Sequence, residues 1–366
     1  MPEKPEAVVV VGGGIVGCFI AYRLAIEGVA VTLVERDTPG AGASGTAGGN
    51  IQPGAGSYGE FQAAIGAESL RLFRHFLPDI KEASGIDPQD QEVQYFHAAL
   101  NDDEARQVRI QAEILYKSGL KAQWIEGADA RKIEPRLSSD VLGGMLLRDC
   151  VQMDASRFVS ALAESARASG VQMLVAEVVG LQRDDNRVTG VLLKDGTEVG
   201  CDTVVLAMGA WVGTVGSEWL RTLLPARPYS LQKLHLRPKG NALGCAVNWG
   251  GINIVSRVDG LVHAGSKHDA AGFEANPTRE GREWILERVN TILPGLDVEV
   301  VDSQAACAAA TPGRIPILSP VEALDGVYLA STASDGFHLS AVIANMLTEL
   351  LVRGKKHHFL ARMRLG

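Results

Sequence analysis

Hydrophobic residues near the start of the chain form continuous runs and do not alternate with polar ones. Val8 to Val11 is an unbroken apolar run, which is typical of a parallel strand buried on both faces. Residues 15–27 have helical spacing and stop at Gly28, and residues 29–35 form a second apolar run. These segments predict one strand–helix–strand unit with parallel strands.

The next part of the chain changes its pattern twice. Residues 62–136 show mostly helical spacing with polar faces, and the segment VQMDASRFVSALAESARASG predicts a helix opened by an Asp/Ser cap. Residues 171–207 predict strands joined by turns at 184–186 and at Asp195-Gly196. That region ends in another buried apolar run, residues 203–207.

Alternating apolar and polar residues return between residues 225 and 301, interrupted by one predicted helix over 278–293. A strand at 327–330, a glycine turn and a helix over 339–352 follow. Segments of a nucleotide-binding fold thus occur at the start, middle and end of the chain. We therefore expect two domains that are interleaved in sequence.

Composition and charge exclude several classes of protein. The 366 residues carry a formal net charge of −8 without a basic stripe, so nucleic-acid binding is not expected. The first apolar run lacks a basic leader and is broken by glycines, which argues against a signal peptide or membrane helix. Five cysteines without C-x-x-C spacing favour a reducing compartment, so we expect a cytoplasmic protein and no metal site. The basic tail RGKKHHFLARMRLG predicts the solvated end of a helix, with a membrane or partner contact as the alternative.

Gly12, Gly14 and Gly17 satisfy the G-x-G-x-x-G pattern between the first predicted strand and helix. Such glycines permit a tight turn, the approach of a diphosphate and close helix packing. Glu35 ends the second strand, where a carboxylate accepts hydrogen bonds from ribose hydroxyls and disfavours a 2′-phosphate. A segment rich in Gly, Ala and Ser, residues 37–59, follows it. The sequence therefore predicts dinucleotide binding, without deciding between FAD and NAD.

Several further segments occur in an order that resembles the superfamily of FAD-dependent D-amino acid, glycine and sarcosine oxidases. They are the N-terminal unit, ASGTAGGN, CVQMDASRFVSALA, VVLAMGAW, TPGRIPILSP and DGFHLSAVIANML. The resemblance implies an α/β (overall α+β) fold in which a Rossmann-type FAD-binding domain is interleaved with an antiparallel-sheet substrate domain. We expect the FAD-binding domain at 1–80, 145–215 and 305–366, and the substrate domain at 81–144 and 216–304.

The same resemblance implies a set of cofactor-binding residues around a non-covalent FAD. They are Gly12, Gly14, Ile15, Val16, Gly17, Glu35, Arg36, Ser44, Gly48, Gly49, Asn50, Val178, Ala207, Gly209, Trp211, Gly336, Phe337, His338 and Leu339. Cys307 lies near the position where the sarcosine branch carries a covalent flavin link, but one residue out of register.

The resemblance also shows what this chain lacks. Relatives carry a W-A-G-x-R-P-x-T-P-D pattern whose arginine binds the substrate carboxylate. With Thr311-Pro312 as the anchor, that arginine position falls on Ala308 and its proline on Ala309. A second arginine, before the final N-G turn of glycine oxidases, is absent from ASTASDGFH. Unless Arg314 or Arg257 takes this role, we expect that the enzyme does not bind ordinary α-amino acids in the usual way.

Other residues could act on the substrate instead. By resemblance to the sarcosine branch, His338 occupies the place of a substrate-binding lysine, and Lys267 or His268 points into the pocket. Alternation along that strand groups His263 with Lys267 and Ser266 with His268. Further substrate-binding candidates are Asn253, Tyr229 and Asn50, with Gln232, Asn248 and Trp249 as weaker ones.

We therefore expect an FAD-dependent oxidoreductase that oxidises a C–N bond of an amine or N-substituted amino acid by hydride transfer to flavin N5. The electron acceptor, O₂ or another, stays open, as does a homo-oligomer or a partner chain of a hetero-oligomeric dehydrogenase. The alternatives are an FAD-dependent enzyme that oxidises a hydroxy acid or polyol, and a catalytically silent FAD-carrying subunit. An NAD-dependent dehydrogenase is disfavoured because VVLAMGAW and the C-terminal turn and helix have no role in one.

Overall fold

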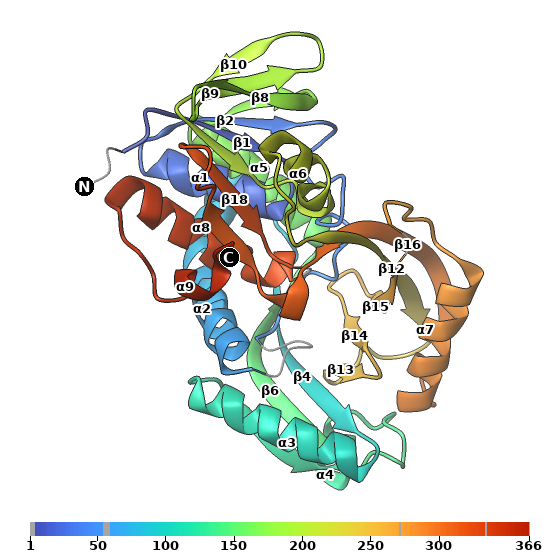
Figure 1. Ribbon diagram of the computed structural model, residues 1–366. Coiled ribbons are helices and arrows are strands. Elements are labelled where there is room, and N and C mark those ends of the chain that lie inside the picture. The colour runs from blue at the N-terminus through green and yellow to red at the C-terminus, as the bar shows by residue number, and fades with distance from the viewer. Residues whose placement is uncertain (1–3, 54–58, 271, 334, 366) are drawn as a thin grey trace.

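The computed structural model describes residues 4–53, 59–270, 272–333 and 335–365 (Figure 1). One sheet has the strand order β17-β18-β11-β1-β2-β7, parallel except for β17. Its strands are β1 (Ala7–Val11), β2 (Ala30–Glu35), β7 (Gln172–Val175), β11 (Thr203–Leu206), β17 (Ile317–Pro320) and β18 (Val327–Ser331). The predicted strand–helix–strand unit is confirmed, with β1 paired to β2 in parallel.

Both faces of this sheet are covered, which explains its continuous apolar runs. Val8, Val10 and Leu33 pack against one side, where four helices gather, and Val9, Val11 and Val34 pack against the other. The helices are α1 (Ile15–Ile26), α2 (Glu60–Ser84), α5 (Ala155–Ala168) and α8 (Gly336–Arg353). The opposite face carries the small antiparallel sheet of β8 (Val178–Asp184), β9 (Arg187–Leu193) and β10 (Glu198–Gly200).

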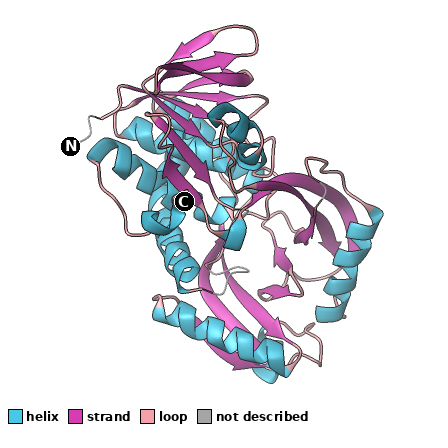
Figure 2. Ribbon diagram, viewed as in Figure 1, coloured by secondary structure: helices cyan, strands magenta, loops and turns pink. Residues whose placement is uncertain are grey.

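A second, larger sheet has the order β16-β12-β15-β14-β13-β4-β6-β3, with β5 paired to β6. Its strands are β3 (Asn50–Ile51), β4 (Gln91–Ala99), β5 (Ala122–Glu126), β6 (Gly143–Gln152), β12 (Arg227–Pro238), β13 (Ala246–Trp249), β14 (Ile252–Ser256), β15 (Val262–Asp269) and β16 (Val298–Ala310). Its pairs are antiparallel except for β4 with β13. This sheet curves away from the first one (Figure 2). The two sheets give the expected α/β fold with an antiparallel-type substrate sheet.

The remaining elements join or cover these sheets. Helices α3 (Asp102–Lys117) and α4 (Gly127–Ile133) lie against the β4–β6 end, and α7 (Arg279–Ile292) covers one face at the β12–β15 end (Figure 1). The short elements are η1 (Gly209–Gly213), α6 (Val215–Leu220), η2 (Pro312–Arg314) and α9 (Leu360–Met363). Within the described ranges, no helix is both long and apolar enough to cross a bilayer.

One sequence-based expectation was incomplete, and another was wrong. Residues 62–136 are mostly helical, as expected, but the strands β4 and β5 lie between the helices. Both strands are held by pairing with the distant β6, which a local pattern does not reveal. The basic tail is not a solvated end, since Phe359 and Leu360 are buried and Phe359 packs edge-to-face on Phe61 at 5.7 Å.

The division into two interleaved domains stays a prediction, and two of its boundaries fall inside strands. The boundary at 144/145 lies within β6, and the boundary at 304/305 lies within β16. Each strand begins in one predicted domain and continues into the other. The last helix also differs slightly, because α8 begins at Gly336, three residues before the predicted start.

Candidate active site

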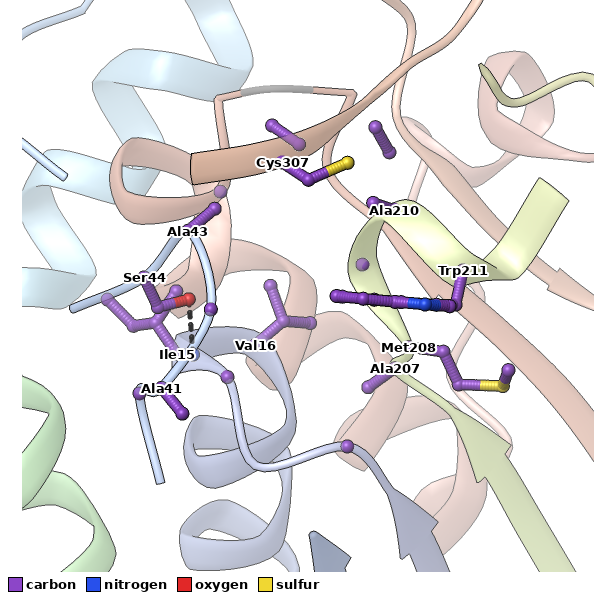
Figure 3. A pocket seen from close by; sticks show the side chains of 18 of the residues that line it. Ile15, Val16, Ala41, Ala43, Ser44, Ala207, Met208, Ala210, Trp211 and Cys307 are labelled. Atoms are coloured by element: carbon purple, nitrogen blue, oxygen red, sulfur yellow. Dashed lines mark hydrogen bonds between the residues drawn. The ribbon is translucent and has the colours of Figure 1, made fainter. Parts of the chain in front are cut away.

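A pocket lies beside the turn between β1 and α1 (Figure 3). Gly12 has φ of 109°, which favours glycine, and a Cβ there would lie 2.5 Å from the carbonyl oxygen of Ala207. A Cβ on Gly17 would lie 1.9 Å from the carbonyl oxygen of Gly12. The packing of the turn therefore requires both glycines. A Cβ on Gly14 would meet only the Ser44 hydroxyl, at 3.1 Å, so Gly14 leaves its backbone open to the pocket.

The N-terminus of α1 faces this pocket. The Ile15 N–H donates to Ser44 Oγ at 3.0 Å (Figure 3). The Gly40 N–H donates to the carbonyl of Gly13 at 2.9 Å and so holds the loop against the turn. First-turn N–H groups have no acceptors inside their own helix and carry partial positive charge. The helix end and the loop over it therefore fit a diphosphate.

One end of the pocket suits a nucleoside. Glu35 at the end of β2 accepts hydrogen bonds from the N–H groups of Gly13 at 2.5 Å and Asp37 at 3.0 Å. The Arg36 guanidinium lies 4.9 Å from the centre of the Trp211 ring, and it pairs with Asp37 at 3.3 Å. A carboxylate in this place binds ribose hydroxyls in dinucleotide-binding folds, so the site fits the adenosine half of FAD.

The large sheet forms another wall of the pocket, and its two faces differ. Leu231 and Lys233 of β12 line the pocket, whereas Gln232 reaches the other way, where its Nε2 donates to the carbonyl of Thr278 at 2.9 Å. Leu234 packs with α7 in the same direction as Gln232. Side chains on the pocket face therefore come from every second residue of this strand.

A β-bulge at Ser266 changes which residues of β15 share a face. Gly265 pairs with Lys233, but Lys267 pairs with Gln232 and His268 with Leu231, so Ser266 has no partner in the register. His263 and His268 thus lie on the pocket side, and Lys267 lies on the α7 side. The grouping of His263 with Lys267, expected from strict alternation, was wrong.

The two catalytic candidates of β15, Lys267 and His268, lie on opposite faces of the sheet, and the bulge decides which of them is on the pocket side. Lys267 Nζ pairs with Asp269 at 2.6 Å and lies 3.6 Å from Glu280 of α7. His268 stacks beside Tyr229, with ring centres 5.3 Å apart, and its burial lowers its imidazole pKa, with Arg314 adding to the effect. His268 is not part of the pocket wall itself, but it lies on the pocket side of the sheet, and this favours His268 over Lys267 as a group that meets substrate.

Ala308 lies directly opposite Tyr229 on the paired strands, and its side chain is buried. The two arginines considered as replacements are both bound to carboxylates. Arg257 pairs with Asp154 and, at 2.9 Å, with Asp259, and Arg314 pairs with Asp335 at 2.9 Å. Burial raises the pKa of Asp335 to about 6, although Arg314 opposes the rise. Both guanidinium groups thus already have an anionic partner.

Asn253 of β14 belongs to a buried polar group beside the pocket-face residues. Its side-chain oxygen and nitrogen are both buried, and its amide acts on the Tyr95 hydroxyl, where it opposes the rise of the Tyr95 pKa that burial causes. Asn50 instead accepts a hydrogen bond from the Tyr95 hydroxyl at 2.8 Å. Of the weaker candidates, Asn248 donates to Gln52 at 2.9 Å, and Trp249 donates to Glu104 at 3.2 Å. Asn253 is therefore the amide best able to accept a new partner.

His338 is placed differently from the expectation. Its ring nitrogens are buried, its Nε2 lies close to Gly66, and no partner for either nitrogen occurs in the described part of the chain. Burial lowers its pKa to about 4. The residue is not part of the pocket wall, and neither is Leu339, which packs in the core. Their roles toward cofactor or substrate stay predictions.

The pocket collects most of the predicted cofactor residues from distant parts of the chain. Those that line it are Gly12, Gly14, Ile15, Val16, Glu35, Arg36, Ser44, Val178, Ala207, Gly209, Trp211, Gly336 and Phe337. Those that do not line it are Gly17, Gly48, Gly49, Asn50, His338 and Leu339. Gly49 supports the loop from behind, because a Cβ there would lie 1.8 Å from the carbonyl oxygen of Met153. Cys307 lines the pocket, with its thiol donating to the carbonyl of Gly272 at 3.4 Å.

Three pocket-face residues were not among the predicted sites. Lys233 and Gln304 line the pocket and pair across β12 and β16, and His263 lies close to Gly48. The signal was the segment LQKLHL, where a lysine and a histidine occupy alternate positions among leucines. The sequence analysis offered Gln232 as a weaker candidate, but that neighbour of Lys233 faces α7 and not the pocket.

Comparisons with known proteins agree with this geometry. The family described as FAD dependent oxidoreductase (DAO) matches residues 7–350. The chain is 30% identical over 358 residues to a glycine oxidase of Pseudomonas aeruginosa, covering 94% of both chains. A crystal structure of glycine oxidase from Geobacillus kaustophilus has a TM-score of 0.91 at 24% identity, covering 100% of this chain and 99% of that one.

An L-proline dehydrogenase from P. horikoshii has a similar structure, with a TM-score of 0.88 and 25% identity over 100% of this chain and 97% of that one. The names of these relatives give two different substrates, glycine and L-proline. On the match over residues 7–350 and the 30% identity along nearly its whole length, this chain belongs to the DAO family of FAD-dependent oxidoreductases, with FAD as its cofactor.

Proposed function

We propose that this enzyme oxidises the C–N bond of an amine or N-substituted amino acid and does not use glycine or D-alanine as its main substrate. The observation that carries the proposal is Ala308, a methyl group where the family resemblance calls for the carboxylate-binding arginine. The nearby Arg257 and Arg314 are bound to carboxylates, so neither supports the usual bidentate grip.

The cofactor, when bound, accepts the two electrons of the oxidation. The residues of this chain have to bind the substrate, orient its C–H bond and exclude water. Asn253 offers a buried amide, beside the Tyr95 hydroxyl, for a polar group of the substrate. Tyr229 and His268 form an adjacent surface in the pocket-face register.

His268 suits a substrate amine that has to react in its uncharged form. Burial lowers the pKa of its imidazole, so the ring is neutral near pH 7 and one nitrogen can accept a proton or hydrogen bond. No strong carboxylate base is required when the amine binds neutral. The proposal therefore places substrate contacts at Asn253, Tyr229 and His268, and leaves Lys267 outside them.

The test is anaerobic stopped-flow absorbance of the flavin-containing protein against a panel of substrates. The panel holds glycine, D-alanine, N-methyl amino acids, opines, free amines, hydroxy acids and polyols, with O₂ added afterwards. We expect rapid bleaching by a secondary amine or N-substituted amino acid. Rapid bleaching by glycine would contradict the proposal, and bleaching only by hydroxy acids or polyols would favour the alternative class of reaction.

Ala308→Arg provides the matched variant. We expect this change to bring no more than about a threefold gain in glycine or D-alanine oxidation, because a guanidinium in this buried place displaces Tyr229 and neighbouring side chains. A large gain with flavin content unchanged would show that the original pocket had lost only one side chain. If dithionite bleaches the flavin and no panel member does, the protein is a silent flavin carrier.

A further inference from the structure

Lys233 is a buried ammonium on the pocket face that the proposed function does not use. Its side chain is 5% exposed and lines the pocket from the centre of β12. Gly265, its neighbour on β15, makes room for it, since a Cβ there would lie 2.7 Å from the Lys233 Cβ. A side chain at position 265 would therefore force the lysine out of its place.

The partners of this ammonium are unusually few. Within the described ranges, its Nζ donates a hydrogen bond to the carbonyl oxygen of Ala47, at 3.3 Å. The carboxylates of Asp154 and Asp302 act on it only from a distance, and burial lowers its pKa to about 8, with Arg257 adding to this. An ammonium taken out of water without an anion beside it costs several kcal/mol, roughly. The surrounding groups do not offset that cost.

Other cations around the pocket differ from Lys233 in this respect. Arg36, Arg257 and Lys267 each have a carboxylate within ion-pair distance. Next to Lys233, His263 is buried with an unpartnered Nδ1, and its burial lowers its pKa well below the ordinary value. His235 is likewise lowered to about 4. Both rings are neutral at pH 7, so the positive charge here belongs to Lys233.

We propose that Lys233 binds the carboxylate of the substrate, in place of the arginine that position 308 lacks. The inference rests on the proposed function and requires that the substrate carry a carboxylate. It therefore favours an N-substituted amino acid over a simple amine. The carboxylate would accept a hydrogen bond from the Lys233 Nζ, beside the Ala47 carbonyl. Lys233 lies four residues along β12 from Tyr229, the residue that pairs with Ala308. A charge-assisted bond of this kind in a buried place is strong and orients the bound molecule.

The experiment measures binding without turnover, so it is independent of whether the right substrate has been found. The flavin-containing protein is titrated with benzoate and with its uncharged isostere benzamide, and the shift of the flavin absorbance gives each Kd. For the unmodified protein we expect benzoate to bind at least tenfold more tightly than benzamide. Equal affinity for the two compounds would overturn the proposal even if no variant could be prepared.

Lys233→Met shortens the side chain by one atom and removes its charge. We expect benzoate affinity to fall about ten- to a hundredfold while benzamide affinity stays the same. Lys233→Gln serves the same purpose if the methionine variant fails to retain flavin. Lys239→Met is the control, because Lys239 is exposed and pairs with Asp297 at 3.0 Å outside the pocket.

The cofactor is the competing source of negative charge for Lys233. FAD affinity and the midpoint potential of the flavin are therefore measured on the same variants. A change in either quantity with the benzoate Kd unaltered would assign Lys233 to the diphosphate or to the reduced ring, and would overturn the proposal. Loss of benzoate affinity with FAD affinity and potential unaltered would support it.

Discussion

At the scale of single residues, the glycines of the first turn have different tasks although one motif contains them all. Gly17 is required by packing, because its Cβ would overlap the carbonyl oxygen of Gly12. Gly14 is open to the pocket, apart from the Ser44 hydroxyl. We predict that Gly14→Ala weakens FAD binding about tenfold or more with little change in the stability of the flavin-free protein. Gly17→Ala should lower that stability by about 2 kcal/mol or more.

Urea unfolding of the flavin-free proteins and equilibrium titration with FAD separate these effects. Gly170→Ala is the control, because Gly170 does not line the pocket and its φ of 95° is unfavourable for alanine. Gly170→Ala should cost stability and leave FAD affinity unchanged. Equal effects of Gly14→Ala and Gly17→Ala on unfolding would show that the distinction between packing and binding is wrong.

At the scale of elements, the N-terminus of helix α3 is fixed by hydrogen bonds between residues close together in the sequence. Asn101 caps its first turn by accepting a hydrogen bond from the Glu104 N–H at 2.9 Å, and Glu104 accepts in return from the Leu100 N–H at 2.8 Å. We predict that Asn101→Ala lowers the free energy of unfolding by about 1 kcal/mol without affecting catalysis, because α3 lies outside the pocket.

Urea unfolding and steady-state kinetics of the variant measure both quantities. Gln107→Ala, at an exposed position in the middle of the same helix, is the matched control and should be nearly neutral or slightly stabilising. A stability loss equal in the two variants would exclude the cap as the cause.

At the scale of the whole molecule, buried histidines link stability to pH. Burial lowers the pKa values of His97 and His338 to about 4, below the ordinary value of about 6.5 for an unfolded chain. Between these pKa values the unfolded state binds more protons than the folded state. The stability that the two buried neutral histidines contribute is therefore fully present above about pH 6.5. It is lost as the pH falls toward 4, at up to about 1.4 kcal/mol per pH unit for each histidine.

Urea unfolding at pH 7, 6 and 5 measures this slope. His97→Gln removes one titrating group, while keeping an amide that can hydrogen-bond Asn248, whose side chain lies 3.1 Å from the His97 ring. In the variant, the free energy of unfolding should depend less steeply on pH, by the slope that corresponds to about one proton. An unchanged slope would mean that His97 is not the neutral buried group described here.

Much of the fold and part of the site followed from the sequence because their signals are local. The run from Val8 to Val11, the glycine pattern and the spacing of the following helix need only a few neighbouring residues to be recognised. The same holds for the caps at Asp154 and Thr278, which accept hydrogen bonds from the N–H groups of Arg157 and Gly281. Strands β4 and β5 were missed because distant strands stabilise them.

The sequence by itself determined the two kinds of sheet, the helix that faces the diphosphate and the alanine that stands in place of an arginine at position 308. Only the tertiary structure decided which side chains meet in the pocket. A single bulge at Ser266 sends Lys267 toward α7 and His268 toward Tyr229, and the phase of β12 brings Lys233 into the pocket. The physical reason is that side chains alternate along a strand, so one unpaired residue reverses the face of every residue that follows it. The position of that unpaired residue depends on the pairing between strands that lie far apart in the chain.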